Sequence, residues 1–257
     1  HPANTLSLHD ALPISQTAVD VQRYLYGNWY VRPSRGGMVR REWFKETLQE
    51  PAWNEIIKTV RSFDMAGSLK TDAYPSPDYF ASVKMSKLKD GTYFIHDVKR
   101  TRIRFGDWFN FIIECSHEDG PHTDYCLPID PNPAAKAATT LLARDLSSAG
   151  LFVRTVKTSQ KKIDRFRPFA SMCMNGGVSI LKDCGTDYEN KIYNDLNFFF
   201  REAESFDGLR RGGESGHDDM VDCISDAFTM LAQKINIGNF LPGIQSIDLS
   251  QKNAFKF

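Results

Sequence analysis

Aspartates gather at three separated places in this 257-residue sequence, and each place borders a predicted regular element. Asp64 and Asp130 each close a short apolar run with the composition of a β-strand. A further group, Asp218, Asp219 and Asp222, opens an amphipathic helix. Carboxylate oxygens suit hard divalent cations such as Mg²⁺ or Mn²⁺, and two such ions can clamp an in-line displacement at phosphorus. The acids therefore predict a metal-dependent nuclease.

The three aspartates of the predicted final helix are not equally strong evidence for a metal site. Asp218 and Asp219 stand at the helix start, where the helix dipole favours any acid. Asp218, Asp222 and Asp226 repeat at i, i+4 and i+8, a spacing at which like charges repel by a few tenths of a kcal/mol per pair. Another face is apolar at helical spacing; it carries Val221, Ile224, Phe228 and Leu231. A bound metal would offset the repulsion, so Asp222 is the most informative of these acids.

An alternation of strands and helices is predicted to bring the acids together. We predict strands at 56–64, 78–88 and 92–103, joined as an antiparallel meander with an Asp-Gly turn, then a helix at 106–120, a strand at 125–130, a helix at 132–150, a strand at 151–158 and a helix at 161–177. This order is that of the ribonuclease H-like topology, an α/β fold in which helices flank a mixed β-sheet. Its first and fourth strands are neighbours, so Asp64 and Asp130 should meet.

The rest of the chain is assigned by its local patterns. We predict a short strand at 178–183, a helix at 188–204, a Gly/Arg loop at 208–216 and a final helix at 217–235. Residues 5–14 resemble the translation of a sequencing-adaptor oligonucleotide, so residues 1–15 are expected to be a disordered artefact. Residues 16–54 are expected to connect to a preceding domain, 55–235 to form the nuclease domain and 236–257 to form a tail.

Charge and composition narrow the possible partners. Lys plus Arg and Asp plus Glu balance at 32 each, so any nucleic-acid binding must come from a local patch. The candidate DNA contacts are Lys157, Lys161, Lys162, Arg165, Arg167, Arg210 and Arg211. A solvated helix face explains most of this basic run equally well. The five cysteines form no CxxC pair and His117 with His122 completes no zinc set. No apolar run approaches the ~20 residues of a membrane span, which favours a cytosolic protein with no membrane partner.

Six phrases, in order, resemble the C-terminal nuclease domain of the large terminase subunit of tailed bacteriophages. They are FDMA at 63–66, PDYFA at 77–81, the P-x-D-P phrase with its following small residues and lysine at 128–136, K-x-x-R at 162–165, G-x-V at 176–178 and HDDMVDC at 217–223. The resemblance extends from about Trp29 to Leu231. It departs from the family at Asn132 and Pro133, where glycine is frequent, at Cys223 in place of alanine, and at Asp130, where many relatives have Glu.

The resemblance implies a two-metal endonuclease that cuts concatemeric double-stranded viral DNA in the cytoplasm of an infected bacterium. By the same resemblance its partners are the small terminase subunit and the portal or procapsid. In that family a P-loop ATPase precedes the nuclease, and no GxxxxGK[ST] phrase occurs here. We therefore expect cutting without an ATP site in this chain. Asp64, Asp130 and Asp219 are the predicted catalytic residues, and Asp218 and Asp222 join them as predicted ligands of two Mg²⁺ or Mn²⁺ ions.

Other readings of the same residues stay open at this point. Asp64 and Asp130 can each be strand-end turn formers. Another ribonuclease H-like enzyme, such as a Holliday-junction resolvase or a transposase, would use similar acids but lacks the 77–79 and 128–131 phrases. A catalytically silent module that docks DNA, portal or capsid is the alternative outside the enzymes.

Overall fold

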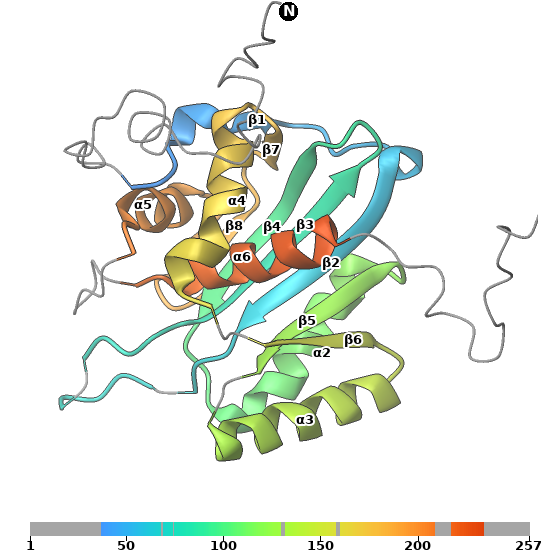
Figure 1. Ribbon diagram of the computed structural model, residues 1–257. Helices are drawn as coiled ribbons and strands as arrows, with labels where there is room; N and C mark the ends of the chain where they lie inside the picture. Colours follow the sequence, from blue (N-terminus) through green and yellow to red (C-terminus); the bar gives the residue numbers. More distant parts are fainter. Residues whose placement is uncertain are drawn as a thin grey trace, which may run out of the picture.

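A mixed β-sheet forms the centre of the computed structural model (Figure 1), which describes residues 37–233 except 68, 74, 130–131, 158–159 and 209–216. The strands run in the order β1-β7-β4-β3-β2-β5-β6, with β8 beside β4 and β9 beside β8. Their bounds are β1 Lys45–Thr47, β2 Ile56–Asp64, β3 Phe80–Leu88, β4 Tyr93–Thr101, β5 Thr123–Ile129, β6 Phe152–Lys157, β7 Val178–Leu181, β8 Gly185–Asp187 and β9 Ile192–Tyr193. The α-helices are α2 Trp108–Asp119, α3 Pro133–Ser148, α4 Lys162–Met174, α5 Asn197–Ser205 and α6 Asp219–Ala232.

The predicted ribonuclease H-like fold is confirmed by the strand pairing. β2, β3 and β4 form the antiparallel meander, and β2 pairs in parallel with β5, with Ser62 opposite Cys126. β5 in turn pairs in parallel with β6. The first and fourth strands of the predicted order are therefore neighbours. Asp64 ends β2, whereas Asp130 follows β5 and lies outside the described residues.

Helices cover both faces of the sheet (Figure 1). On one face, α2 and α3 pack Trp108, Ile112 and Leu146 against Phe63 of β2. On the other face, α6 lies across β2 and β3 with α4 beside it. The four apolar residues predicted to form one face of α6 are all buried there. Asp222 and Asp226 are buried as well, so this helix is a core element that carries acids.

Two segments differ from the boundaries expected of them. The helix predicted at 188–204 begins only at Asn197, because the residues before it form β8 and β9 with a turn between them. Asp187 holds that turn through its carboxylate, which accepts bonds from the Asn190 backbone and side-chain nitrogens at 3.1 and 2.7 Å. In the expected connecting segment 16–54, Lys45–Thr47 form β1 and pair with β7, and Val39 and Phe44 lie in the core.

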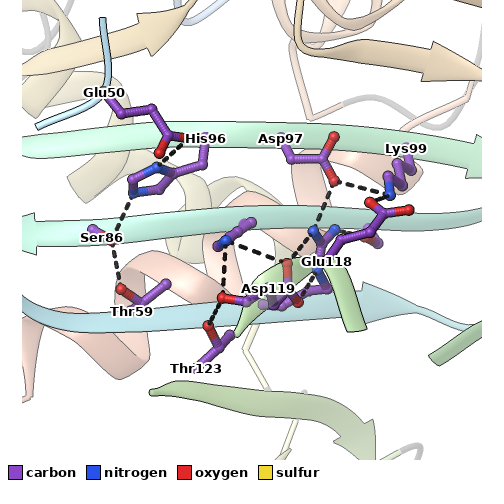
Figure 2. Close-up of polar contacts among 12 residues, drawn as sticks. Glu50, Thr59, Ser86, His96, Asp97, Lys99, Glu118, Asp119 and Thr123 are labelled. Atoms are coloured by element: carbon purple, nitrogen blue, oxygen red, sulfur yellow. Dashed lines mark hydrogen bonds and ion pairs between the residues drawn. The ribbon is translucent and has the colours of Figure 1, made fainter. Parts of the chain in front are cut away.

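A buried ionic network ties the end of α2 to the meander (Figure 2). Arg61 of β2 is 1% exposed and donates two hydrogen bonds of 2.6 Å to Asp119, the last residue of α2. The same guanidinium lies 2.8 Å from Asp97 of β4. Side chains alternate along a strand, so Arg61 shares the face of Phe63, opposite to Val60 and Asp64. The network therefore braces the sheet from the side facing away from the acids.

Removal of the Asp119 carboxylate should destabilise the fold strongly. Asp119→Ala leaves the Arg61 guanidinium buried without its bidentate partner, and loss of one member of a buried pair typically costs about 3–5 kcal/mol. Urea unfolding should show this loss as a lower midpoint at an unchanged slope. The control is Asp145→Ala, because the Arg144–Asp145 pair is 71% and 48% exposed and its loss should stay within ~0.5 kcal/mol. Equal effects of the two changes would contradict a structural role for the network.

Candidate active site

Aspartates from three separate parts of the chain line one cavity of about 780 Å³. Asp64 enters from the end of β2, and the residues after β2 and before β3 form part of the wall. The described lining contains six carboxylates, which are Asp64, Asp78, Asp218, Asp219, Asp222 and Asp226. Two basic side chains also line it, Lys162 and Arg165 of α4. The cavity is thus strongly acidic, with its cations supplied by one helix.

The alternation of side chains along β2 places Asp64 on the face of the sheet that α6 covers. Val60 belongs to the core on the α6 side of β2, and Phe63 belongs to the core on the opposite side. Asp64 is an even number of residues from Val60, so it shares the face of Val60. It is also the last residue of the strand, where the α6-side core opens into the cavity. A carboxylate at this point is held by rigid backbone while remaining partly accessible.

Buried polar partners hold the start of α6. Glu202 of α5 accepts hydrogen bonds from the Met220 and Val221 backbone nitrogens, which lie in the first turn of α6. Acids stabilise this end of a helix because its amides are otherwise unpaired and its dipole is positive. Burial, followed by the charge of Asp219, raises the pKa of Glu202 to about 8. Glu202 therefore acts as a cap that arrives from another helix.

Asp219 is the most enclosed of the predicted catalytic residues that the structure describes. It is 4% exposed, and its Oδ2 accepts a hydrogen bond of 3.0 Å from the Tyr79 backbone nitrogen. His217 Nδ1 lies 3.5 Å from the same oxygen and 3.7 Å from Asp78 Oδ1. These two carboxylates raise the pKa of His217 to about 9, so its imidazole is cationic near neutral pH. His217 thus orients Asp219 as a charged donor.

The basic residues of α4 pair with the acids repeated along α6. Lys162 Nζ lies 2.7 Å from Asp218 Oδ1 and 2.7 Å from Asp222 Oδ2. Arg165 contacts Asp222 Oδ1 and lies 2.5 Å from Asp226 Oδ1. The repulsion between acids at i, i+4 and i+8 is therefore offset within the protein itself. The sequence-based argument that a metal would offset it omitted this internal source of positive charge.

Three carboxylates of the cavity, Asp64, Asp222 and Asp226, have raised pKa values. Burial, followed by the charges of Asp222 and Asp219, raises the pKa of Asp64 well above its ordinary value. Burial raises the pKa of Asp222 even though Lys162 and Arg165 oppose the shift. Burial likewise raises the pKa of Asp226 to about 6. Carboxylates whose ionisation is opposed by burial and by neighbouring acids are frequent at functional sites.

This donor set fits a hard divalent cation. Oxygen ligands from several carboxylates suit Mg²⁺ or Mn²⁺. A cation would offset the burial and the neighbouring negative charges that raise the pKa of Asp64. Asp78, His217 and Asp219 also place one ligand atom each within 4.8 Å of one another.

The predicted site residues fall into three groups. Asp64, Asp218, Asp219, Asp222, Lys162 and Arg165 all line the cavity. Lys157 instead lines a neighbouring hollow of about 560 Å³, whose wall also includes Arg165 and Gln160. Lys161 is exposed, and Arg167 is partly buried 3.2 Å from Asp164. Asp130, Arg210 and Arg211 lie outside the described residues, although Pro128, two positions before Asp130, lines the cavity.

Two further acids of the cavity were absent from the predicted ligand set. Asp226 was visible in the helical spacing, but only its burial and its contact with Arg165 place it in the cavity wall. Asp78 was treated as a residue that opens a strand, and it stands two positions before β3 begins. The 77–81 phrase was the available signal for Asp78. Its contact with His217 comes from tertiary structure.

Comparison with known proteins identifies the family of this chain. The family described as Terminase RNaseH-like domain matches residues 61–231. The chain belongs to this family. Its match includes Asp64 and all the acids of α6 that line the cavity. No curated protein gives a match to the chain. Among the part that the structure describes, no helix is long and apolar enough to cross a bilayer.

Solved terminase structures share the fold. The nuclease domain of the human cytomegalovirus terminase, soaked with Mn and bound to an inhibitor, has a TM-score of 0.54 at 12% identity, over 76% of this chain and 95% of that one. The large terminase of a thermophilic bacteriophage, in complex with ADP, has a TM-score of 0.59 at 15% identity. That match covers 89% of this chain and 53% of the bacteriophage chain. At these identities the similarity shows the ribonuclease H-like fold.

Neutralising Asp64 should stabilise the metal-free protein in a pH-dependent way. The pKa of Asp64 is higher in the folded than in the unfolded state, so its ionised form opposes folding above that pKa. Asp64→Asn should raise the melting temperature in EDTA at pH 7.5 by ~2–4 °C, or about 1 kcal/mol in a domain of this size. The gain should shrink as pH falls through the raised pKa, because wild-type Asp64 then binds a proton on folding.

The control for this measurement is Asp145→Asn, which changes an exposed acid on α3. It should leave the melting temperature nearly unchanged at both ends of the pH range. A lower stability of Asp64→Asn at pH 7.5 would show that this carboxylate is stabilised by its surroundings and would contradict the raised pKa described above.

Proposed function

We propose that the protein is the nuclease part of a viral terminase large subunit, a Mg²⁺- or Mn²⁺-dependent endonuclease that cuts concatemeric double-stranded DNA. The observation that carries this proposal is the meeting of Asp64 with the α6 acids in one cavity of a terminase RNaseH-like fold. Asp64 and the α6 acids come from segments far apart in the chain, and the fold brings them into one cavity. This convergence supports a shared function for these acids.

The chain's own residues divide the work between them. Asp64, Asp219 and Asp222 would hold the ions, with Asp130 and Asp218 as further predicted ligands. Two bound ions would supply water activation and stabilisation of the leaving 3′ oxygen. His217 and the Tyr79 backbone nitrogen hold Asp219 in place. Glu202 holds the helix on which two of the ligands stand.

DNA would reach the cavity along the basic side of α4. Lys157 lines the adjacent hollow, and Lys161 is exposed at the start of α4. Arg167 is a further proposed phosphate contact, as are Arg210 and Arg211, which lie outside the described residues. Phosphate contacts of this kind position a duplex without reading its sequence. The proposed partners are double-stranded DNA, the small terminase subunit and the portal or procapsid, and the proposed location is the cytoplasm of an infected bacterium.

Loss of one cavity carboxylate should abolish cutting. Asp222→Asn replaces a charged ligand with a neutral amide, and metal ions contribute several kcal/mol of charge stabilisation in the transition state. Plasmid nicking in Mn²⁺ should therefore fall at least ~100-fold. The matched control is Asp164→Asn, because Asp164 lies on neighbouring α4 but is 48% exposed and pairs with Arg167. The control should cut at close to the wild-type rate.

A thermal unfolding assay separates an enzyme from a silent docking module. The wild-type melting temperature should rise with Mn²⁺ concentration because the ion binds the folded state. A docking module without a metal site would show no such rise. Normal cutting by Asp222→Asn, in a preparation that is free of contaminating nuclease, would reject the assignment of this cavity as the active site.

A further inference from the structure

The two bases that pair with the α6 acids sit in different environments. The Lys162 side chain is 46% exposed and places a single nitrogen between Asp218 and Asp222. The Arg165 side chain is 8% exposed and spans Asp222 and Asp226 with two nitrogens. A lysine is a compact charge on a flexible stem, whereas an arginine is a planar fork suited to fixed pairing. Lys162 is thus the mobile partner and Arg165 the fixed one.

Both carboxylate oxygens of Asp222 are already engaged by these bases. Arg165 contacts Oδ1, and Lys162 lies 2.7 Å from Oδ2. An incoming divalent ion that binds Asp222 must therefore share or replace one of these contacts. Displacing the buried Arg165 from Asp222 would leave one guanidinium nitrogen without a partner while the other stays held by Asp226, and an unpaired buried charge is costly. Lys162 can leave by rotation into solvent at little cost, since partly exposed ion pairs contribute little to stability.

We propose that Lys162 is an exchangeable internal counter-ion: a divalent cation displaces it from Asp222, and the released ammonium then pairs with a DNA backbone phosphate. This inference rests on the proposed metal-dependent nuclease function. Lys162 would thus have two successive anionic partners, first the α6 carboxylates and then a DNA phosphate. The change of partner would couple metal binding to DNA binding. Before the ion enters, Lys162 reduces the repulsion between Asp218 and Asp222. After the ion enters, the acids no longer need it.

The exchange makes metal and DNA binding cooperative. A phosphate that approaches the metal-free cavity meets carboxylates and a lysine already paired to them. A phosphate that approaches the loaded cavity meets a free ammonium as well as the ions. Coupling of this kind is reciprocal, so DNA should also strengthen metal binding. Arg165 has no such second role, because it stays paired with Asp226 on the inner side of α4.

Lys161 provides a matched control. It precedes Lys162 directly and is exposed, and among the described residues it has no ion pair. Lys161→Met and Lys162→Met remove the same charge from neighbouring positions and differ only in the contact with the acids. Lys162→Arg keeps a positive charge at the critical position. None of these side chains is buried in the core, so all three variants should fold.

The first experiment titrates Mn²⁺ while following thermal unfolding. Lys162→Met should be less stable than wild type in EDTA, because Asp218 and Asp222 lose their shared partner. It should nevertheless need a roughly five-fold lower Mn²⁺ concentration for half of the maximal stabilisation, as expected on removal of two partly exposed ion pairs that compete with the ion. Lys161→Met should stay close to wild type, and Lys162→Arg, which keeps the positive charge, should need at least as much Mn²⁺ as wild type.

The outcomes of this titration are distinct. Unchanged or weaker Mn²⁺ binding by Lys162→Met, with normal binding by wild type, would overturn the exchange and leave the proposed function standing. No Mn²⁺ stabilisation of any of the proteins would overturn both.

The second experiment measures DNA binding against salt concentration, once in EDTA and once in Ca²⁺. Released Lys162 adds one phosphate contact, so the wild-type log–log slope should be steeper by about 0.9 in Ca²⁺ than in EDTA. Lys161→Met should show the same increase from a shallower starting slope if Lys161 contacts phosphate in both conditions. Lys162→Met should show no increase. An increase in Lys162→Met equal to that of wild type would overturn the transfer of Lys162 to DNA.

Discussion

The structure depends on holding several carboxylates close together in a partly buried cavity. Burial, and to a lesser degree the charges of neighbouring acids, raise the pKa values of Asp64, Asp222 and Asp226, so their ionised forms oppose folding. The fold tolerates them because each acid stands on an element that is fixed for other reasons. Asp64 ends a strand with paired neighbours on both sides, and Asp222 stands on a helix whose apolar residues fill the core. A bound ion would therefore stabilise carboxylates whose ionised forms oppose folding in the metal-free protein.

Rigidity at the cavity comes from features on both sides of the sheet. On the α6 side, Glu202 caps the helix and Tyr79 donates its backbone hydrogen to Asp219. On the opposite side, the buried Arg61 joins β2 to Asp119 and Asp97. β2 therefore carries a buried cation on one face and a proposed catalytic acid on the other, three residues apart. A strand that is anchored in this way can present Asp64 without moving when a charged substrate arrives.

Sequence patterns predicted the elements well where the local signal and the tertiary environment agree. The order of strands and helices from Ile56 to Met174 and the burial of Val221, Ile224, Phe228 and Leu231 follow from periodicity and turn residues. The adjacency of β2 and β5 follows from the ribonuclease H-like topology that this order matches. The helix predicted at 188–204 was too long because the turn held by Asp187 and Asn190 depends on a side chain already placed by Arg100, 2.7 Å away. Pairing of β1 with β7 joins distant segments, and no local pattern specifies it.

The candidate site also contains features that local sequence patterns predict and features that only tertiary structure reveals. The acids were recognisable because strand ends and helical repeats are local features, and these features also decide which face a side chain takes. The partners of Lys162 and Arg165 were not recognisable, because a basic run on a helix looks the same whether it faces water, DNA or a row of aspartates. Only the packing of α4 beside α6 distinguishes the paired bases Lys162 and Arg165 from the exposed Lys161. A basic residue of a nuclease can therefore belong to the metal site first and to the DNA surface second, and its sequence position alone does not separate the two roles.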